Sequence, residues 1–247
     1  MSSLFDVSGK SIVIAGGAGG IGAPLATFLH HQGAQMTLCD INTDSAFKGE
    51  SGVSHRNTLQ ADIRNASDCR ALMKHAQERF DKIDVVINAV GVLPIVQAAS
   101  MDAETFRKCL DTNVTAALLL SQAAKEFMHR GGAIIHIASV SSLVSNTGYA
   151  AYAASKAALA QLVKVLAREW AADGIRVNAI GPALVETPLT ADYLSDAEFR
   201  ANAIDSIPMK RLARVEDLHG AVLLLSSTAS EFITGQTIYV DGGRTLV

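Results

Sequence analysis

The 247-residue sequence has little that would tie it to a membrane or a nucleic acid. It contains no apolar run approaching the roughly 20 residues that cross a bilayer. Only 5% of its residues are aromatic, it has no basic run, and its net charge is −3, so a nucleic-acid-binding surface is not expected. The first ten residues lack a basic segment followed by an apolar stretch, which predicts no signal peptide and a cytoplasmic protein.

Cysteine and histidine are also few and scattered. Cys39, Cys69 and Cys109 are odd in number and form no Cys-x-x-Cys pair. Among the seven histidines only His30 and His31 are adjacent, and neighbouring residues of a helix point apart. We therefore expect buried, reduced thiols and no metal site.

Apolar residues, in contrast, make up 49% of the chain, which is ample for a buried core. Near-continuous apolar strands alternate with helices, a pattern that predicts an α/β fold with a doubly wound parallel sheet covered on both faces. No linker-like segment divides the chain, so we expect one domain over residues 1–247. The expected strands are 11–15, 35–39, 58–60, 84–88, 133–138, 175–180 and 237–240, and the expected helices are 20–32, 66–80, 103–130, 150–172 and 215–229.

The segment from about 184 to 208 is the one long stretch without clear periodicity. It holds two prolines that follow Thr187 and Ile207, and it has room for a short helix near 195–203. Because a long irregular segment in a compact domain is usually functional, we interpret it as a substrate lid. The alternative is a poorly patterned pair of helices.

A glycine-rich turn separates the first expected strand from the first helix. Glycine there permits a tight turn and lets a pyrophosphate approach backbone N–H groups at the helix start. Asp40 lies at the end of the second strand, 18 residues after Gly22, where a carboxylate would bind the ribose hydroxyls of a dinucleotide; the alternative is a turn cap before Asn42. The turn can be read in two registers, Gly17, Gly19 and Gly22 or Gly16, Gly20 and Gly22.

Ser139, Tyr152 and Lys156 could together move a proton at a carbonyl oxygen. Ser139 precedes Tyr152 by thirteen residues, and a helix would place Lys156 one turn after Tyr152 on the same face. A nearby ammonium lowers the pKa of a phenol, and a serine hydroxyl can hold the substrate oxygen. The alternative is a tyrosine at the edge of the core and a lysine that extends to water.

Taken together, these residues resemble the short-chain dehydrogenase/reductase family over essentially the whole chain. The resemblance implies a Rossmann fold and an oxidoreductase that interconverts a secondary alcohol and a ketone. It implies that Tyr152 is the acid/base, that Lys156 lowers the pKa of Tyr152 and binds the nicotinamide ribose, and that Ser139 orients the substrate oxygen. Asn113 would hold a water that links Lys156 to solvent.

The resemblance favours the register Gly16, Gly20 and Gly22, and it extends to the C-terminal strand with its Asp-Gly-Gly end. The sequence departs from the family pattern at Ala15, Ala89 and Ala183, of which the first two fall where the first and fourth strands end beside each other. The implied cofactor-binding residues are Gly16, Gly19, Gly20, Ile21, Gly22, Asp40, Asp62, Ile63, Asn88, Gly91, Tyr152, Lys156, Pro182, Val185 and Thr187.

The cofactor is expected to be NAD, because Asp40 would repel the 2′-phosphate of NADP and no basic residue follows it before Lys48. The helix 150–172 is apolar over more than one face, and in the resembled family such helices pair in dimers and tetramers, so we expect a homotetramer or at least a dimer.

The substrate is less constrained. The head of the chain, residues 4–10, resembles members that act on sugar acids and polyols, so a small-molecule sugar, sugar acid or polyol is the favoured substrate. Asn146 and Tyr149 would face it together with Ser139 and Tyr152; alternatively, they are a loop cap and a core contact. A 3-oxoacyl-thioester reductase and a non-catalytic dinucleotide-binding regulatory protein remain as alternatives.

Overall fold

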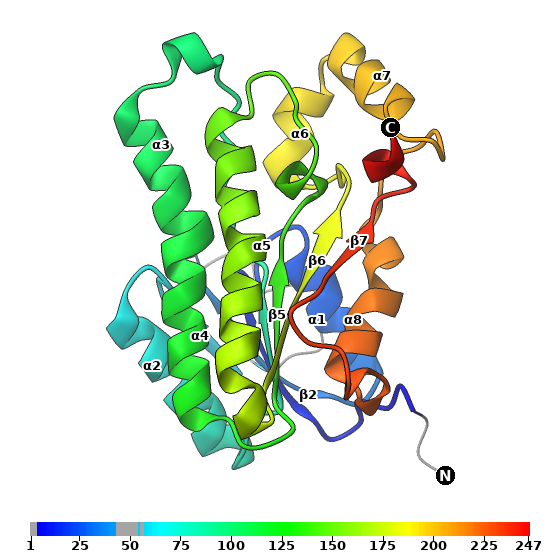
Figure 1. Ribbon diagram of the computed structural model, residues 1–247. Coiled ribbons are helices and arrows are strands. Elements are labelled where there is room, and N and C mark those ends of the chain that lie inside the picture. Colours follow the sequence, from blue (N-terminus) through cyan, green and yellow to red (C-terminus); the bar gives the residue numbers. More distant parts are fainter. Residues whose placement is uncertain (1–3, 43–53, 55–56) are drawn as a thin grey trace.

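The sheet organises the whole fold. A computed structural model describes residues 4–42, 54 and 57–247; Lys48, part of the argument for NAD, lies outside them. Within this described part, seven parallel strands form one sheet in the order β3-β2-β1-β4-β5-β6-β7 (Figure 1). The predicted doubly wound α/β fold is confirmed. The strands are β1 (Ser11–Ala15), β2 (Gln35–Asp40), β3 (Thr58–Gln60), β4 (Val85–Asn88), β5 (Ala133–Ile137), β6 (Arg176–Pro182) and β7 (Thr237–Val240).

Helices cover both faces of the sheet (Figure 1). One face carries α2 (Ala66–Phe80), α4 (Ala116–Phe127) and α5 (Ala150–Trp170), with α3 (Ala103–Leu110) packed against α5. The other face carries α1 (Gly22–His31) and α8 (His219–Ser226). None of the helices in the described ranges is both long enough and apolar enough to cross a membrane.

The two covered faces explain why most strand residues are apolar. In β1, Val13 and Ala15 belong to the cluster under α2, α4 and α5, whereas Ile12 and Ile14 belong to the cluster under α1 and α8. Successive side chains of a strand point to opposite faces, so a strand covered on both sides is buried at every position and is mostly apolar; Ser11 is the one polar residue of β1. All five residues of β1 are buried accordingly.

The expected single helix 103–130 is interrupted. A π-helical turn, η3 (Asp111–Thr115), separates α3 from α4, and α4 ends at Phe127. Asn113 lies in this turn, and its side chain bonds both main-chain groups of Val92 at 2.9 and 3.0 Å. The insertion of one residue into the helical repeat therefore turns Asn113 toward the loop after β4.

The expected helix 215–229 is also divided. A 3₁₀ turn, η6 (Val215–Leu218), leads into α8, and a second turn, η7 (Thr228–Ser230), follows it. Between α8 and η7 the backbone of Ser227 is extended (φ −110°, ψ 179°), and this ends the helix. The Ser227 side chain then caps η7 by accepting from the N–H of Ala229.

The glycine turn after β1 brings three backbones close together. Gly16 has φ +78°, and a Cβ there would lie 3.0 Å from the carbonyl carbon of Ala89. A Cβ on Gly22 would overlap the main-chain oxygen of Gly16, and one on Gly20 would lie 2.7 Å from the Cβ of Thr187. The register Gly16, Gly20 and Gly22 thus consists of positions where a side chain has no room.

The segment expected to form the lid contains two short helices, α6 (Pro188–Leu194) and α7 (Ala197–Asp205). This agrees with the alternative of a helical pair, although only the second helix was expected at a stated position. Pro188 opens α6, where its missing N–H costs nothing, and the Asp196 carboxylate accepts from two N–H groups at the start of α7. Both helices stand beyond the carboxyl ends of the strands, and the C-terminal turn η8 (Arg244–Leu246) lies beside α7 (Figure 1).

Candidate active site

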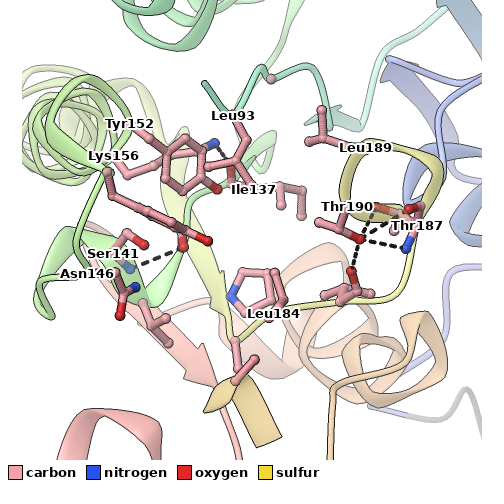
Figure 2. Close-up of a pocket in the computed structure, with 18 of the residues that line it drawn as sticks. Leu93, Ile137, Ser141, Asn146, Tyr152, Lys156, Leu184, Thr187, Leu189 and Thr190 are labelled. Carbon is pink, nitrogen blue, oxygen red and sulfur yellow. Dashed lines mark hydrogen bonds between the residues drawn. The ribbon is translucent and has the colours of Figure 1, made fainter. Parts of the chain in front are cut away.

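A cavity of about 500 Å³ opens at the carboxyl edge of the sheet. Figure 2 shows Tyr152 and Lys156 on one side of it and Thr187, Leu189 and Thr190 on the other. Crevices of this kind form in open α/β sheets where neighbouring strands continue in opposite directions, here β1 and β4. The sequence-predicted residues that line the cavity are Gly19, Gly20, Ile21, Gly91, Ser139, Asn146, Tyr149, Tyr152, Lys156, Pro182, Val185 and Thr187.

Other predicted residues lie outside the lining of this cavity. Ile63 is buried in the core, and Asp62 forms an ion pair with Arg64 at 2.7 Å. The side chain of Ile63 is therefore not exposed for ligand contact, and the Asp62 carboxylate is engaged by Arg64, whose hydrogen bonds hold its pKa below the usual range. The remaining predicted residues outside the lining are Gly16, Gly22, Asp40, Asn88 and Asn113.

Lys156 is buried, with only 4% of its surface exposed. Its ammonium donates to the main-chain oxygen of Ile137 at 2.8 Å and lies 5.6 Å from the centre of the Tyr152 ring. Burial lowers the pKa of Lys156 to about 8, because the protein solvates the ammonium less well than water does. The alternative in which this lysine extends to water is therefore wrong.

Tyr152 faces the cavity one helical turn before Lys156, as predicted (Figure 2). Its pKa, however, is raised rather than lowered. Burial raises the pKa of Tyr152 to about 12, and a hydrogen bond with the Ser139 side chain opposes this only in part. The expected effect of Lys156 is not seen because desolvation dominates and the ammonium is held by Ile137.

Ser139 follows β5 and begins a short 3₁₀ turn, η4 (Val140–Ser142). Its hydroxyl accepts a hydrogen bond from the N–H of Ser141 at 3.1 Å, which fixes the side chain at the rim of the cavity. Tyr149 is 8% exposed and meets Tyr152 edge to face, with ring centres 5.8 Å apart. The three side chains thus surround the position that a substrate oxygen would take.

Asn113 is buried behind the cavity. Besides its bonds to Val92, its amide nitrogen donates to the Ser155 hydroxyl at 2.9 Å. A Cβ on Gly91 would lie 3.4 Å from Asn113 Oδ1 and 3.5 Å from Lys156 Nζ, so these two groups are neighbours. The Asn113 side chain therefore holds the π-helical turn and the loop after β4 together next to Lys156.

Asn88 does not face the cavity, because its amide holds the end of β4. Its oxygen accepts from the N–H of Val90 at 3.1 Å, and its nitrogen lies 3.3 Å from His136 Nδ1. Burial lowers the pKa of His136 to about 4, so this ring is neutral at physiological pH. At Ala15 and Ala89, where the sequence departs from the family pattern, the backbone joins the two strand ends, since the N–H of Ala89 donates to the Ala15 oxygen at 2.9 Å.

The residues around the glycine turn fit a dinucleotide. The start of α1 has no side-chain cap and no acidic residue in its first turn, so its N–H groups are free of competing side-chain anions. Asp40 lies beside the turn, accepting from the N–H of Ala18 and of Asn42, each at 3.2 Å. A carboxylate next to the phosphate-binding turn is what recognition of ribose hydroxyls requires.

Sequence reasoning missed most of the polar groups that the lid and the C-terminus bring to the cavity. Asn202 and Ser206 line it from α7, and Arg244 lines it from η8. Nothing in the spacing of these residues could have identified them, because they meet only after the chain has folded. Arg200, on the same helix α7, pairs with Glu186 at 2.7 Å and is not part of the lining.

Comparison with known proteins gives consistent matches along the chain. A model of the family described as enoyl-(acyl carrier protein) reductase matches residues 16–245. An uncharacterized short-chain type dehydrogenase/reductase of Sinorhizobium fredii is 34% identical over 95% of this chain, which spans only 43% of that longer protein. A 3-oxoacyl-[acyl-carrier-protein] reductase of Rickettsia felis is 32% identical over 99% of this chain and 100% of its own length.

Solved structures share the fold. A putative short-chain alcohol dehydrogenase from Sinorhizobium meliloti superposes with a TM-score of 0.92 at 29% identity, covering 99% of both chains. The aldohexose dehydrogenase of Thermoplasma acidophilum gives a TM-score of 0.86 at 26% identity, covering 99% of this chain and 97% of that one.

The buried ammonium of Lys156 predicts a pH-dependent stability. Below about pH 8 the folded and unfolded states are both protonated at Lys156, and the folded state bears the full cost of the buried charge. Between about pH 8 and the ordinary value of 10.5, the unfolded state binds more protons, so this group makes the free energy of unfolding rise with pH. The free energy of unfolding of Lys156→Met should lack this contribution, which amounts to about 3 kcal/mol at most in the wild type.

Urea unfolding of the wild type and of Lys156→Met between pH 7 and pH 10 measures this effect. The stability of the wild type relative to the variant should increase with pH. Lys74→Met on the exposed face of α2 is the control and should keep a nearly constant difference from the wild type. A pH-independent difference for Lys156→Met would mean that the ammonium is not destabilised by burial.

Proposed function

This chain belongs to the short-chain dehydrogenase/reductase family, and we propose that it is an NAD-dependent oxidoreductase that interconverts a secondary alcohol and a ketone. One observation carries the proposal: Ser139, Tyr152 and Lys156 line the same cavity as Gly19, Gly20 and Ile21 of the glycine turn. A substrate held between Ser139 and Tyr152 can therefore meet a dinucleotide bound at the turn.

The chain's own residues handle the proton. In the oxidation direction Tyr152, as phenolate, takes the hydroxyl proton of the alcohol, while Ser139 donates a hydrogen bond to the same oxygen. The nicotinamide cofactor supplies the hydride acceptor, and its oxidised ring adds a positive charge. Burial raises the pKa of Tyr152 to about 12 although the Lys156 ammonium lies 5.6 Å from the ring centre, so positive charge beyond that of Lys156 must stabilise the phenolate.

The favoured substrate is a sugar, sugar acid or polyol. Hydroxyl and amide groups of Asn146, Thr147, Asn202 and Ser206 line the cavity and could bind several substrate hydroxyls. The similarity to an aldohexose dehydrogenase supports this class. The similarity to a 3-oxoacyl-[acyl-carrier-protein] reductase supports the alternative, a thioester reductase.

A non-catalytic, dinucleotide-binding regulatory protein is a weaker alternative. Such a protein would not need Lys156 buried at the base of a cavity beside Tyr152, an arrangement that costs stability. A lysine whose burial destabilises the fold, placed in the same cavity as Ser139, favours catalysis.

We also propose a role for the segment that covers the cavity and a cellular location for the enzyme. The helices α6 and α7 act as the substrate lid of one domain that comprises residues 1–247. They pack on a small apolar cluster that is separate from the two main ones and that also contains Val140 and Ala183 at the carboxyl edge of the sheet. The enzyme acts in the cytoplasm.

Tyr152→Phe tests the reaction. Only a hydroxyl is lost, so turnover should fall by about 10³-fold or more while the dissociation constant of NADH stays within about twofold. Lys156→Ala should impair both turnover and cofactor binding. Tyr239→Phe is the control, since its hydroxyl bonds Ser142 and the residue is not part of the lining. Absorbance assays on sugars, sugar acids, polyols and 3-oxoacyl thioesters provide the measurement, and unchanged turnover by Tyr152→Phe would refute the mechanism.

The cofactor preference depends on Asp40. Its carboxylate would accept bonds from free ribose hydroxyls and repel a 2′-phosphate, so kcat/KM should favour NAD over NADP by about 100-fold or more. Asp40→Ala should reduce the NAD-to-NADP ratio of kcat/KM, mainly by weakening the binding of NAD. Ile41→Arg, at an exposed neighbouring position, should raise kcat/KM for NADP. Asp173→Ala, a surface control paired with Lys125, should leave the ratio unchanged. A wild-type preference for NADP would contradict the proposed position of Asp40.

The outer face of α5 supports a homotetramer, or at least a dimer. Ala151 and Leu159 are buried on the sheet, whereas Ala154, Ala158 and Val165 are exposed, Val165 by 43%. Sedimentation at micromolar concentration should give about four times the 26.0 kDa chain mass. Val165→Lys should shift the protein toward smaller species without loss of helical content, because a second helix would then cover a charge. A wild-type protein that sediments only as a monomer would refute this.

A further inference from the structure

The cavity has an uneven charge distribution. Among the described residues that line it, Lys156 and Arg244 carry charge, and no aspartate or glutamate is present. Lys156 is already engaged at the base of the site by the Ile137 oxygen. Arg244 is half-buried on the C-terminal turn, and the ion pairs found among the described residues do not include it. The cavity therefore presents a guanidinium that no acidic side chain neutralises.

The contacts of Arg244 leave it able to bind a ligand. Its two terminal nitrogens donate to the oxygen of Val247, the last residue of the sequence, at 3.1 Å and to Asn146 Oδ1 at 3.2 Å. A guanidinium has further N–H donors beyond these two, arranged in a planar fork that matches a carboxylate. The bond to Asn146 also links Arg244 to the loop between Ser139 and Tyr152.

The backbone under Arg244 is held firmly. The Asp241 carboxylate accepts from the N–H groups of Gly243 and Thr245 at 3.0 and 2.8 Å, and so caps the turn. Gly242 accepts from the N–H of Met209 at 3.1 Å, and a Cβ on Gly243 would lie 3.0 Å from Pro208. The turn that carries Arg244 is thus packed against the end of the lid, so its side chain is presented to the cavity from a fixed support.

We propose that Arg244 binds the carboxylate of the substrate, and that the substrate is a polyhydroxy acid rather than a neutral sugar or polyol. This inference rests on the proposed function, because it assigns the substrate class of the same site. Arg244 would hold the carboxylate while Asn146, Asn202 and Ser206 bind hydroxyls and Tyr152 and Ser139 hold the reacting oxygen. A 3-oxoacyl thioester is neutral on both sides of its ketone and offers no such group to Arg244.

The kinetic test compares acids and neutral analogues of equal chain length. The substrates are five- and six-carbon aldonates and the corresponding polyols, each assayed with NAD. The wild type should have a higher kcat/KM for aldonates, and Arg244→Gln should reduce the aldonate-to-polyol ratio of kcat/KM by about 30-fold, mainly through KM. Arg244→Lys, which keeps the charge without the fork, should restore part of the ratio.

Arg200→Gln is the matched control. This arginine lies on α7, but it pairs with Glu186 outside the lining of the cavity, so its loss should leave the ratio unchanged. If the wild type oxidises polyols or reduces 3-oxoacyl thioesters better than it oxidises aldonates, or if Arg244→Gln leaves the ratio unaltered, the inference is wrong although the proposed oxidoreductase function stands.

A binding measurement keeps the test independent of turnover. Calorimetric titration of Tyr152→Phe with aldonates and polyols, in the presence of NADH, measures recognition without reaction. Aldonates should bind more tightly, and the advantage should disappear in Tyr152→Phe/Arg244→Gln. Equal affinities for the two classes would overturn the assignment of Arg244, whereas tight aldonate binding without turnover by the wild type would instead count against the proposed reaction.

Discussion

The close approach of β1 and β4 at their carboxyl ends is the constraint on which the site depends. The chain leaves these neighbouring strands toward opposite faces of the sheet, so no crossover covers the space between them. Gly16 can turn there only because it lacks a side chain that would strike Ala89. The backbone bond from Ala89 to Ala15 then holds the two ends together, and the crevice above them receives α1, the loop after β4 and the lid.

Electrostatics within this crevice are set by burial more than by charge pairing. The Lys156 ammonium is held by a neutral main-chain oxygen, and its pKa falls to about 8 because burial removes the water that would solvate the charge. The Tyr152 phenol, close by, keeps its proton firmly for the same reason. The pKa values of Lys156 and Tyr152 should therefore shift when a charged ligand enters the cavity, because each added charge acts in a poorly solvated environment.

The lid and the C-terminal turn form one support on the outer side of the cavity. Tyr239 and Ile207 belong to the small cluster under α6 and α7, and Asp241 caps the turn that follows β7. A shift of the lid would therefore displace Arg244 together with Asn202 and Ser206. Substrate recognition and lid position are coupled through packing in this arrangement.

Much of the fold could be predicted from the sequence because it depends on local patterns. The strands β1, β3 and β7 and the helix α2 have the predicted bounds, since their apolar residues recur at the periods of a strand or a helix. Two expected helices are interrupted, 215–229 and 103–130, the second of them by the π-helical turn at Asn113. Its cause is a bond to Val92, 21 residues away in the chain, which no local pattern records.

The sequence by itself determined which candidate residues share the glycine turn and which share one face of α5, because Tyr152 and Lys156 lie one helical turn apart and Gly16, Gly20 and Gly22 lie within one loop. Only the tertiary structure decided the pKa of these groups, since desolvation depends on everything packed around them. It also decided that Asp62 is engaged by Arg64 and that Arg244 reaches Asn146, 98 residues away. Contacts between distant segments arise from the packing of the sheet, and a single sequence contains no local signal for them.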